Sequence, residues 1–398
     1  MIRFATLCAI AVIATPATAR TITVAAGSGA QERLQGALLD AKPGDVVAIG
    51  AGRFDLTDGL SLDVPRVTVR GAGRDKTVLS FKGQLGAGEG LLVTSDDVVL
   101  RGFAVEDTHG DGIKSKGANR IVYADLRVEW TGGPKETNGA YGVYPVSSAQ
   151  VLIDGVIVKG ASDAGIYVGQ SKQIIVRNSI ASGNVAGIEI ENSRHADVFH
   201  NVATHNTGGI LVFDLPNLPR LGGGDVRVFE NEIVSNDQVN FAPKGNIVAT
   251  VRRGTGVLVM ANDNVLVTRN HLSGNATANV MIVSYRNSFT DTHYNPFPRG
   301  VVVENNAHGP AGFDPDLPGA AMLTAAFGGS IPPVLWDGAG DGKALGLKVA
   351  DPVKILGMGI AQGAPMDTAR PALAVLDGTA PTPPAPVVLP DSMEAAVR

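Results

Sequence analysis

The stretch VLIDGVIVKGASDAGIYVGQSKQIIVRN, residues 151–178, contains the same short strand pattern at both of its ends. Three apolar residues are followed by a polar one and then by Gly155 or Asn178, and these two closing residues are 23 positions apart. Similar patterns run from Val98 to Asn305, and the shortest step between them is again 23 residues. Because so short a step leaves no room for a crossover helix, we expect successive strands to stack directly on one another in parallel.

A second pattern supports the same repeat, because a glycine or its equivalent stands before an aliphatic residue once in each unit. Most steps are 22 or 23 residues, with longer steps of 30 and 47 where loops are inserted. The pairs are Gly90-Leu91, Gly112-Ile113, Gly142-Val143, Gly165-Ile166, Gly187-Ile188, Gly209-Ile210, Gly256-Val257 and Asn279-Val280. Two strands in phase predict an all-β fold, a right-handed parallel β-helix (solenoid) of roughly ten coils over residues 20–308.

The two ends of the chain lack this repeat. Residues 31–41 place Leu34 and Leu38 at helical spacing and predict a short amphipathic helix. We expect this helix to cap the first coil, whose open strand edges would otherwise bind another chain. Residues 309–379 predict an irregular C-terminal capping segment, and the Pro-rich residues 380–398 predict a disordered tail.

The first residues are typical of a secretory signal peptide, predicted as residues 1–19. Arg3 precedes an apolar run over residues 4–13, and Ala-Thr-Ala follows at residues 17–19. Cys8 lies within this signal, so no disulfide or thiolate metal site is expected. We expect a periplasmic or secreted monomer with no membrane span, since the apolar run is too short to cross a bilayer. A formal net charge of -5 does not favour nucleic acid as a partner.

Side chains alternate across a strand, so the second residue after each glycine of the second pattern points outward. In the middle of the chain this outward column and its neighbours are polar and aromatic, comprising Asp111, Lys114, Lys116, Tyr141, Tyr144, Tyr167, Glu189 and Glu191. Stacked on neighbouring coils, these residues predict the floor of a groove that binds an extended polymer. The substrate-binding candidates are Lys116, Asp111, Tyr167, Glu189 and Glu191. The alternative is an ordinary solvated sheet face on which the tyrosines pack flat.

The N-terminal sequence ITVAAGSGAQERLQGALLDAKPGDVVAIGAGRFDL, followed by VTVRGAGRDKTVLSF, resembles the opening of the pectin-lyase-like superfamily. The coils are similar to its β-helix repeat proteins, which include alginate C5-epimerases and copper-maturation periplasmic proteins, and the resemblance covers about residues 22–308. It implies a carbohydrate-active protein with lyase or C5-epimerase activity on an acidic polysaccharide. In such a reaction a base removes the proton at C5 while a cation or hydrogen-bond donors hold the carboxylate.

The segment YGVYPV, which begins at Tyr141, resembles the Tyr-Gly-Phe-Asp-Pro-His stretch of the alginate C5-epimerases. It matches at Tyr141, Gly142 and Pro145, and it has Tyr144 and Val146 where the epimerases have aspartate and histidine. The catalytic candidates are Tyr141, Lys114, His109 and Tyr144. The two departures leave a second class open, a non-catalytic periplasmic repeat protein that binds a glycan or a protein partner.

Asp107 and Asp111 supply carboxylate oxygens close to one turn, which is compatible with a Ca²⁺ site. The alternative is that both are turn residues that bond to neighbouring backbone. No other cofactor is expected to be required.

Asparagines recur at one turn position of successive units, at Asn178, Asn201, Asn231, Asn270 and Asn305. They predict a ladder in which stacked amides satisfy buried backbone groups of the turns.

Overall fold

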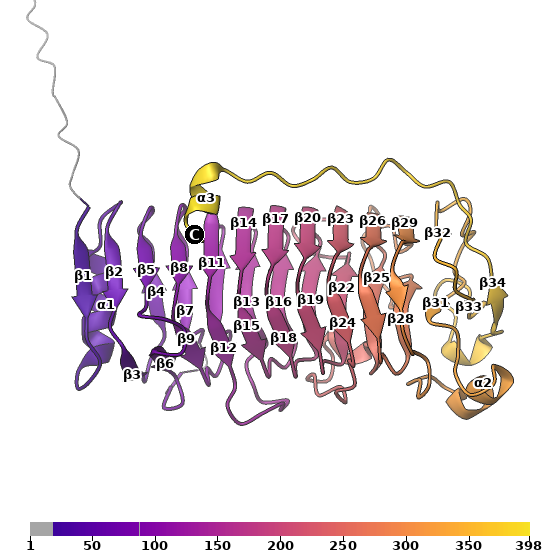
Figure 1. Cartoon of the computed structure of the whole chain (residues 1–398), viewed down its shortest axis with the longest axis horizontal. Helices are drawn as coiled ribbons and strands as arrows, with labels where there is room; N and C mark the ends of the chain where they lie inside the picture. The colour runs from indigo at the N-terminus through magenta and orange to yellow at the C-terminus, as the bar shows by residue number, and fades with distance from the viewer. Residues whose placement is uncertain (1–18, 87) are drawn as a thin grey trace, which may run out of the picture.

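The computed structural model describes residues 19–398 with the exception of residue 87. The predicted signal peptide therefore lies outside the described residues, apart from its last one. From residue 20 onward the chain winds into a rod of stacked coils, as Figure 1 shows. Each complete coil contributes one strand to each of three sheets, and strands of successive coils pair in parallel. The predicted right-handed parallel β-helix is confirmed.

Sheet A contains twelve strands: β1 Thr21–Val24, β2 Val46–Ile49, β5 Thr68–Arg70, β8 Val99–Arg101, β11 Ile121–Ala124, β14 Ala149–Asp154, β17 Lys172–Arg177, β20 Arg194–Phe199, β23 Gly224–Phe229, β26 Asp263–Thr268, β29 Arg299–Glu304 and β32 Lys348–Val349. Sheet B contains ten: β3 Gly52–Asp55, β6 Thr77–Ser80, β9 Ala104–Glu106, β12 Arg127–Glu129, β15 Ile157–Lys159, β18 Ile180–Ser182, β21 Val202–Thr204, β24 Glu232–Val234, β27 His271–Ser273 and β30 Ala307–His308. Sheet C contains twelve: β4 Leu60–Leu62, β7 Leu91–Val93, β10 Ile113–Lys116, β13 Tyr141–Val146, β16 Ala164–Gly169, β19 Ala186–Glu191, β22 Gly208–Phe213, β25 Thr255–Met260, β28 Ala278–Val283, β31 Val334–Trp336, β33 Ile355–Gly357 and β34 Ala372–Ala374.

The helices are short and lie at the ends of the rod or on its side. They are α1 Ala30–Asp40, α2 Ala320–Ala326 and α3 Asp391–Ala395, with 3-10 turns at Ile247–Thr250 and Met366–Thr368. Across residues 19–86 and 88–398, no helix is long and apolar enough to cross a membrane.

The glycine pattern of the sequence corresponds to sheet C, and its register is the one that the spacing predicts. Ile113 pairs with Val143, and Val143 pairs with Ile166. The preceding glycines permit close approach of successive coils: a Cβ atom at Gly142 would lie 2.2 Å from Cγ1 of Val158 and 2.6 Å from the carbonyl oxygen of Gly165. A larger residue at this position would push the coils apart.

Two asparagine ladders run along the turns, one of them close to the predicted one. Asn201, Asn231 and Asn270 are linked by hydrogen bonds between side-chain amides of 2.9 to 3.0 Å. Asn178 and Asn305 do not belong to this ladder, because the pairing places Ser179 and Asn306 at its two ends. The second ladder was not predicted, and it consists of Asn184, Asn206, Asn236, Asn275 and Asn279.

Both ends of the rod are covered. The predicted capping helix is α1, which packs on the first coil with Leu34 and Leu38 fully buried. At the other end, β31, β32 and β33 continue the sheets into the segment predicted as irregular, and β34 closes sheet C by pairing antiparallel.

The prediction of a disordered tail over residues 380–398 is wrong. This segment runs back along the rod, and α3 lies beside the early coils (Figure 1). Leu389 and Met393 are buried in an apolar cluster that includes outward side chains of β11, β14 and β17. Glu394 also forms an ion pair of 2.7 Å with Arg177. Apolar contacts and this ion pair therefore offset the entropy cost of ordering a Pro-rich chain.

Candidate functional site

The outward column predicted from the sequence lies on the outer face of sheet C, where parallel pairing stacks it residue on residue. Lys114 of β10 is aligned with Tyr144 of β13, and Tyr167 of β16 is aligned with Glu189 of β19. The strands on either side, β7 and β22, carry a leucine at the same position. Polar and aromatic groups are therefore concentrated on adjacent rungs in the middle of this face.

Lys114 is held at one edge of the column by two carboxylates. Its Nζ atom lies 2.8 Å from Oε1 of Glu89, 3.2 Å from Oδ2 of Asp111 and 4.8 Å from the centre of the Tyr144 ring. Burial lowers the pKa of Lys114, but its hydrogen bonds to the two carboxylates and their charges outweigh that effect and raise it overall. Burial raises the pKa of Asp111 even though Lys114 is close. Lys114 is therefore positively charged at neutral pH and in contact with an aromatic ring.

Tyr141, Tyr144 and Tyr167 form one aromatic cluster. The ring centre of Tyr141 lies 4.5 Å from those of the other two, which are 4.9 Å apart. Two of the hydroxyl groups also donate hydrogen bonds to carboxylates, Tyr141 to Asp163 at 3.4 Å and Tyr167 to Glu191 at 2.6 Å. The tyrosines thus pack on one another, as the alternative interpretation requires, and carry polar contacts as well.

Three carboxyl groups lie against these tyrosines. Asp163, Glu189 and Glu191 are 4%, 1% and 6% exposed, and Oε2 of Glu189 has no hydrogen-bond partner within the described residues. Burial raises the pKa of all three, and at Asp163, where the charge of Glu191 adds to burial, the pKa rises to about 7. Buried acids this close together do not all ionise near neutral pH, so the cluster holds exchangeable protons.

The tyrosines remain protonated in this environment. Burial raises the pKa of Tyr141, Tyr144 and Tyr167, and the charges of nearby carboxylates raise it further. At Tyr144 the positive charge of Lys114 partly opposes that rise. Neutral phenols of this kind donate hydrogen bonds to the acids beside them.

A loop from a later coil covers the acidic part of the face. Residues 235–254 connect β24 to β25, and Asn246 in this loop donates a hydrogen bond of 3.2 Å to Asp163. Two valines of the same loop belong to an apolar cluster that includes Tyr167. The outward column is therefore covered over β16 and β19, and its exposed or partly exposed side chains lie on and beside β10 and β13.

The predicted substrate-binding residues consequently fall into two groups. Lys116 is exposed and Asp111 is partly exposed. Tyr167, Glu189 and Glu191 are buried, so they contact a ligand only if the covering loop moves.

Of the four catalytic candidates, the structure brings three together. Lys114, Tyr141 and Tyr144 lie on adjacent rungs, whereas His109 is exposed on the turn before β10. Its ring Nδ1 lies 3.1 Å from the carbonyl oxygen of Gly86, so it is engaged with the preceding coil.

Asp107 and Asp111, the two predicted calcium ligands, have separate partners in the structure. Asp107 accepts hydrogen bonds of 2.7 Å from both the backbone N–H and the hydroxyl of Thr131, whereas Asp111 is paired with Lys114. Leaving aside residues 1–18 and 87, no group of three His, Cys, Asp or Glu side chains is arranged to hold a metal ion. Asp107 thus bonds to Thr131 of the next coil and Asp111 to Lys114, and the calcium site stays a prediction.

Asp163 was missed by the sequence analysis although it contacts the tyrosine cluster. It stands two residues before Gly165, and the equivalent positions on the other coils hold only small or apolar residues and threonine: Gly88, Gly110, Ala140, Val185, Thr207, Gly254 and Thr277. A single acid in such a column is a signal that could have identified it.

A family model described as "Right handed beta helix region" matches residues 79–219, and no curated protein matches the chain. The A-module of a mannuronan C-5 epimerase from Azotobacter vinelandii superposes with a TM-score of 0.55 at 14% identity, covering 79% of this chain and 89% of that one. A family 28 exopolygalacturonase from Yersinia enterocolitica gives 0.52 at 12% identity, covering 76% and 68%. A DFA-IIIase from Arthrobacter chlorophenolicus in complex with DFA-III gives 0.52 at 13% identity, covering 81% and 92%. At these identities the likeness establishes a shared fold.

Proposed function

The chain has the pectin-lyase-like fold, and we propose that it is a carbohydrate-active enzyme that moves the C5 proton of a uronate unit in an acidic polysaccharide, as a lyase or C5-epimerase. One observation carries the proposal: the charged Lys114 lies beside a tyrosine cluster in which Tyr141 is hydrogen-bonded to a carboxyl group of pKa about 7. The chemistry needs fixed positive charge and a proton-exchanging group within reach of one sugar. The epimerase module among the similar structures supports the same class of substrate.

Lys114 would bind the carboxylate of the uronate. Its ammonium group is partly exposed and is shared between Glu89 and Asp111, so the substrate carboxylate replaces one of these two partners. Asp111, whose pKa is already raised by burial, takes up a proton more readily than Glu89. Burial raises the pKa of Glu89 as well, but the hydrogen bond from Lys114, a backbone hydrogen bond and the Lys114 charge together outweigh burial and lower it overall. Neutralising the sugar carboxylate stabilises the negative charge that develops when the C5–H bond breaks.

Tyr141 and Asp163 would exchange the C5 proton as a pair. The phenol of Tyr141 passes its own proton to Asp163 as its oxygen takes up the proton from C5, so no free phenolate has to form in this acidic setting. Tyr144, whose ring centre lies 4.5 Å from that of Tyr141, is placed to supply the second proton. The positive charge of Lys114 beside its ring partly stabilises the phenolate that this leaves, and after the step Tyr144 regains a proton from solvent while Asp163 releases its proton. Delivery to the O4 leaving group completes elimination, and delivery to the opposite face of C5 completes epimerisation.

Turnover of a panel of acidic polysaccharides tests this proposal. Elimination creates a C4–C5 double bond that absorbs at about 235 nm. Replacement of Tyr141 by Phe should lower the rate of elimination by about a hundredfold or more, while binding of the polysaccharide is retained. Lys114→Met should weaken binding and rate together, because it removes the partner of the carboxylate. Tyr285→Phe, which changes a tyrosine on a different loop, is the matched control and should have wild-type activity.

Full activity in Tyr141→Phe with an unchanged melting temperature would contradict the assignment. It would mean that the tyrosine only packs and that any chemistry takes place elsewhere.

A second function is favoured by a different observation. Lys114 is already neutralised by two carboxylates, and the acids on β19 are closed off from solvent. Both features suit a non-catalytic protein that holds a glycan or a protein partner on the accessible part of the face. Binding to a polysaccharide with neither absorbance change nor proton exchange at C5 would select this function.

We also propose that the protein works as a monomer in the periplasm or outside the cell, after removal of residues 1–19. N-terminal sequencing of the fractionated protein should give Arg20 as the first residue, and light scattering should give one chain per particle. An uncleaved chain in the cytosol would contradict the proposed location.

A further inference from the structure

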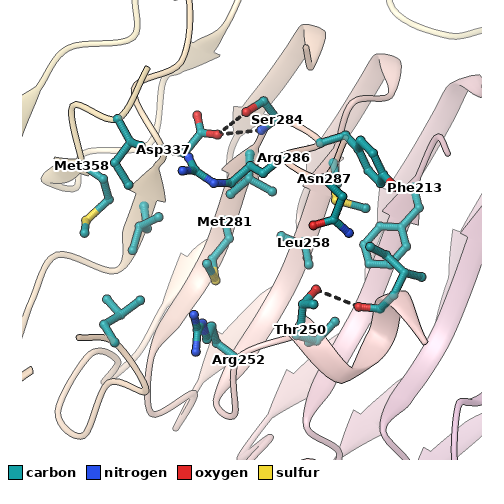
Figure 2. Close-up of a pocket in the computed structure, with 18 residues that line it drawn as sticks. Phe213, Thr250, Arg252, Leu258, Met281, Ser284, Arg286, Asn287, Asp337 and Met358 are labelled. Atoms are coloured by element: carbon teal, nitrogen blue, oxygen red, sulfur yellow. Dashed lines mark hydrogen bonds between the residues drawn. The ribbon is translucent and has the colours of Figure 1, made fainter. Parts of the chain in front are cut away.

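A second site lies on the same face of sheet C, beyond the acidic cluster toward the C-terminus. A cavity of about 250 Å³ opens between the late strands β25, β28 and β31 and the loops that cover them. Figure 2 shows Leu258, Met281 and Met358 directed into this cavity, with Phe213 at one end. Most of its lining is apolar, and methionines contribute several of the walls. Such a lining excludes water from an apolar ligand and adapts to its shape.

Two guanidinium groups reach this apolar space. Arg286 donates from Nη2 to the carbonyl oxygen of Ala364, while its Nη1 atom is buried and has no hydrogen-bond partner in the described part of the chain. Arg252 lies at another side of the cavity, and its side chain forms no ion pair or hydrogen bond with any described residue. A buried N–H group without a partner is costly, so it favours a ligand that supplies an acceptor.

The one acid among the described lining residues does not supply that acceptor. Asp337 accepts hydrogen bonds from the backbone N–H of Ser284 at 2.7 Å, from its hydroxyl at 2.6 Å and from the N–H of Ala339 at 3.0 Å. The structure shows no ion pair between Asp337 and either arginine. The lining therefore has two positive charges against one negative charge that is already hydrogen-bonded, so an anionic group is favoured.

We propose that this cavity binds a small amphipathic carboxylate, whose apolar part fills the space between the methionines and whose carboxylate accepts a hydrogen bond from the unpartnered Nη1 of Arg286. A cavity of about 150 Å³ accommodates benzene, so 250 Å³ holds a ligand of about ten non-hydrogen atoms. Octanoate has that size and chemistry. A sugar does not match this lining, because its hydroxyl groups would meet apolar side chains that form no hydrogen bonds. The site is separate from the proposed catalytic residues, since none of them lines it.

Isothermal titration with octanoate tests the proposal on the full chain. We expect one molecule to bind, and we expect Arg286→Met to weaken binding by about tenfold or more, since the charge is lost while the volume is nearly kept. Arg70→Met, which removes an exposed arginine on β5, should leave binding unchanged. The affinity for 1-octanol, which lacks the charge, should be the same in wild type and Arg286→Met. Arg286→Gln provides a second charge-removing variant if Arg286→Met does not fold.

The position of the ligand is checked by nuclear magnetic resonance. Octanoate should shift the methyl signals of Met281 and Met358, which line the cavity, and leave that of Met393 on α3 unchanged. Absence of octanoate binding would overturn the proposal, and so would equal octanoate affinity in wild type and in the folded Arg286 variant. Shifts at Met393 alone would overturn it as well, because the ligand would then lie on the tail.

Discussion

The buried acids beside the tyrosines make the stability of the fold depend on pH in a defined direction. Burial, followed by the charge of Glu191, raises the pKa of Asp163 from 3.8 to about 7, so the folded state binds this proton more tightly than the unfolded chain does. The unfolded chain therefore loses the proton first as pH rises. The free energy of unfolding is expected to fall between about pH 4 and pH 7 and to level off above that range.

The size of the effect follows from the change in pKa. A rise from 3.8 to about 7 corresponds to a loss on the order of 4 kcal/mol between the two ends of this pH range. Glu189 and Glu191 act in the same direction, because burial raises the pKa of each. Carboxylates whose pKa is lowered by an arginine, such as Asp45 with a pKa of about 2, behave differently. They lose their contribution to the free energy of unfolding only below about pH 4, so they do not affect the change expected between pH 4 and pH 7.

Urea unfolding between pH 4 and pH 8 measures this dependence, and Asp163→Asn is the perturbation. The variant keeps a side chain that accepts the Tyr141 hydrogen bond but does not ionise. Its free energy of unfolding should therefore fall by a few kcal/mol less than that of wild type between pH 4 and pH 8. Glu136→Gln removes an exposed carboxylate and should follow wild type. Equal pH dependence in wild type and Asp163→Asn would mean that Asp163 does not change its ionisation in this range, contrary to the prediction.

Two further predictions concern the scaffold. Asn231 donates to Asn270 and to two backbone carbonyls inside the first asparagine ladder, so Asn231→Ala should lower the free energy of unfolding by about 2 to 4 kcal/mol. Asn305→Ala, outside the ladder, should lower it by only about 1 kcal/mol. Equal losses of the two variants in urea unfolding would contradict the stabilising role of the ladder. Met393→Ala should detach the tail, because it removes about 2 kcal/mol or more of the free energy that buried apolar contacts contribute there. Amide exchange should then rise over residues 386–398 with little change in the core. Unchanged exchange over these residues would contradict the docking of α3.

The sequence predicted the fold and the register of sheet C because both depend on a period that the chain repeats many times. The glycine pattern aligned Lys114 with Tyr144 and Tyr167 with Glu189, and the structure has the same pairs. The period carries this information because each coil must present the same face to the same neighbour.

The accessibility of the site was not predictable in the same way. Glu189 and Glu191 lie where the register predicted, but the loop over residues 235–254 buries them, and that loop contains no repeat. Its position depends on particular contacts, such as the hydrogen bond from Asn246 to Asp163. A pattern that reports which face a side chain is on does not report what covers that face.

The tail was mispredicted for a related reason. Its proline content favours disorder, yet Leu389 and Met393 are spaced four residues apart and meet an apolar column on sheet A formed by Val122, Leu152 and Ile175. Aliphatic residues at outward positions of β11, β14 and β17 required a covering element, and that requirement was readable from the register.

Exchange of the C5 proton is the direct test of the proposed activity, because elimination and epimerisation both break the C5–H bond. The protein is incubated in D₂O with polymers of uronic acids, and deuterium at C5 of the products and of the remaining polymer is measured by nuclear magnetic resonance. We expect deuterium incorporation or loss of the C5 proton with wild type, and a rate lower by about a hundredfold or more with Tyr141→Phe. Complete retention of the C5 proton in every uronate polymer that the protein binds would contradict it.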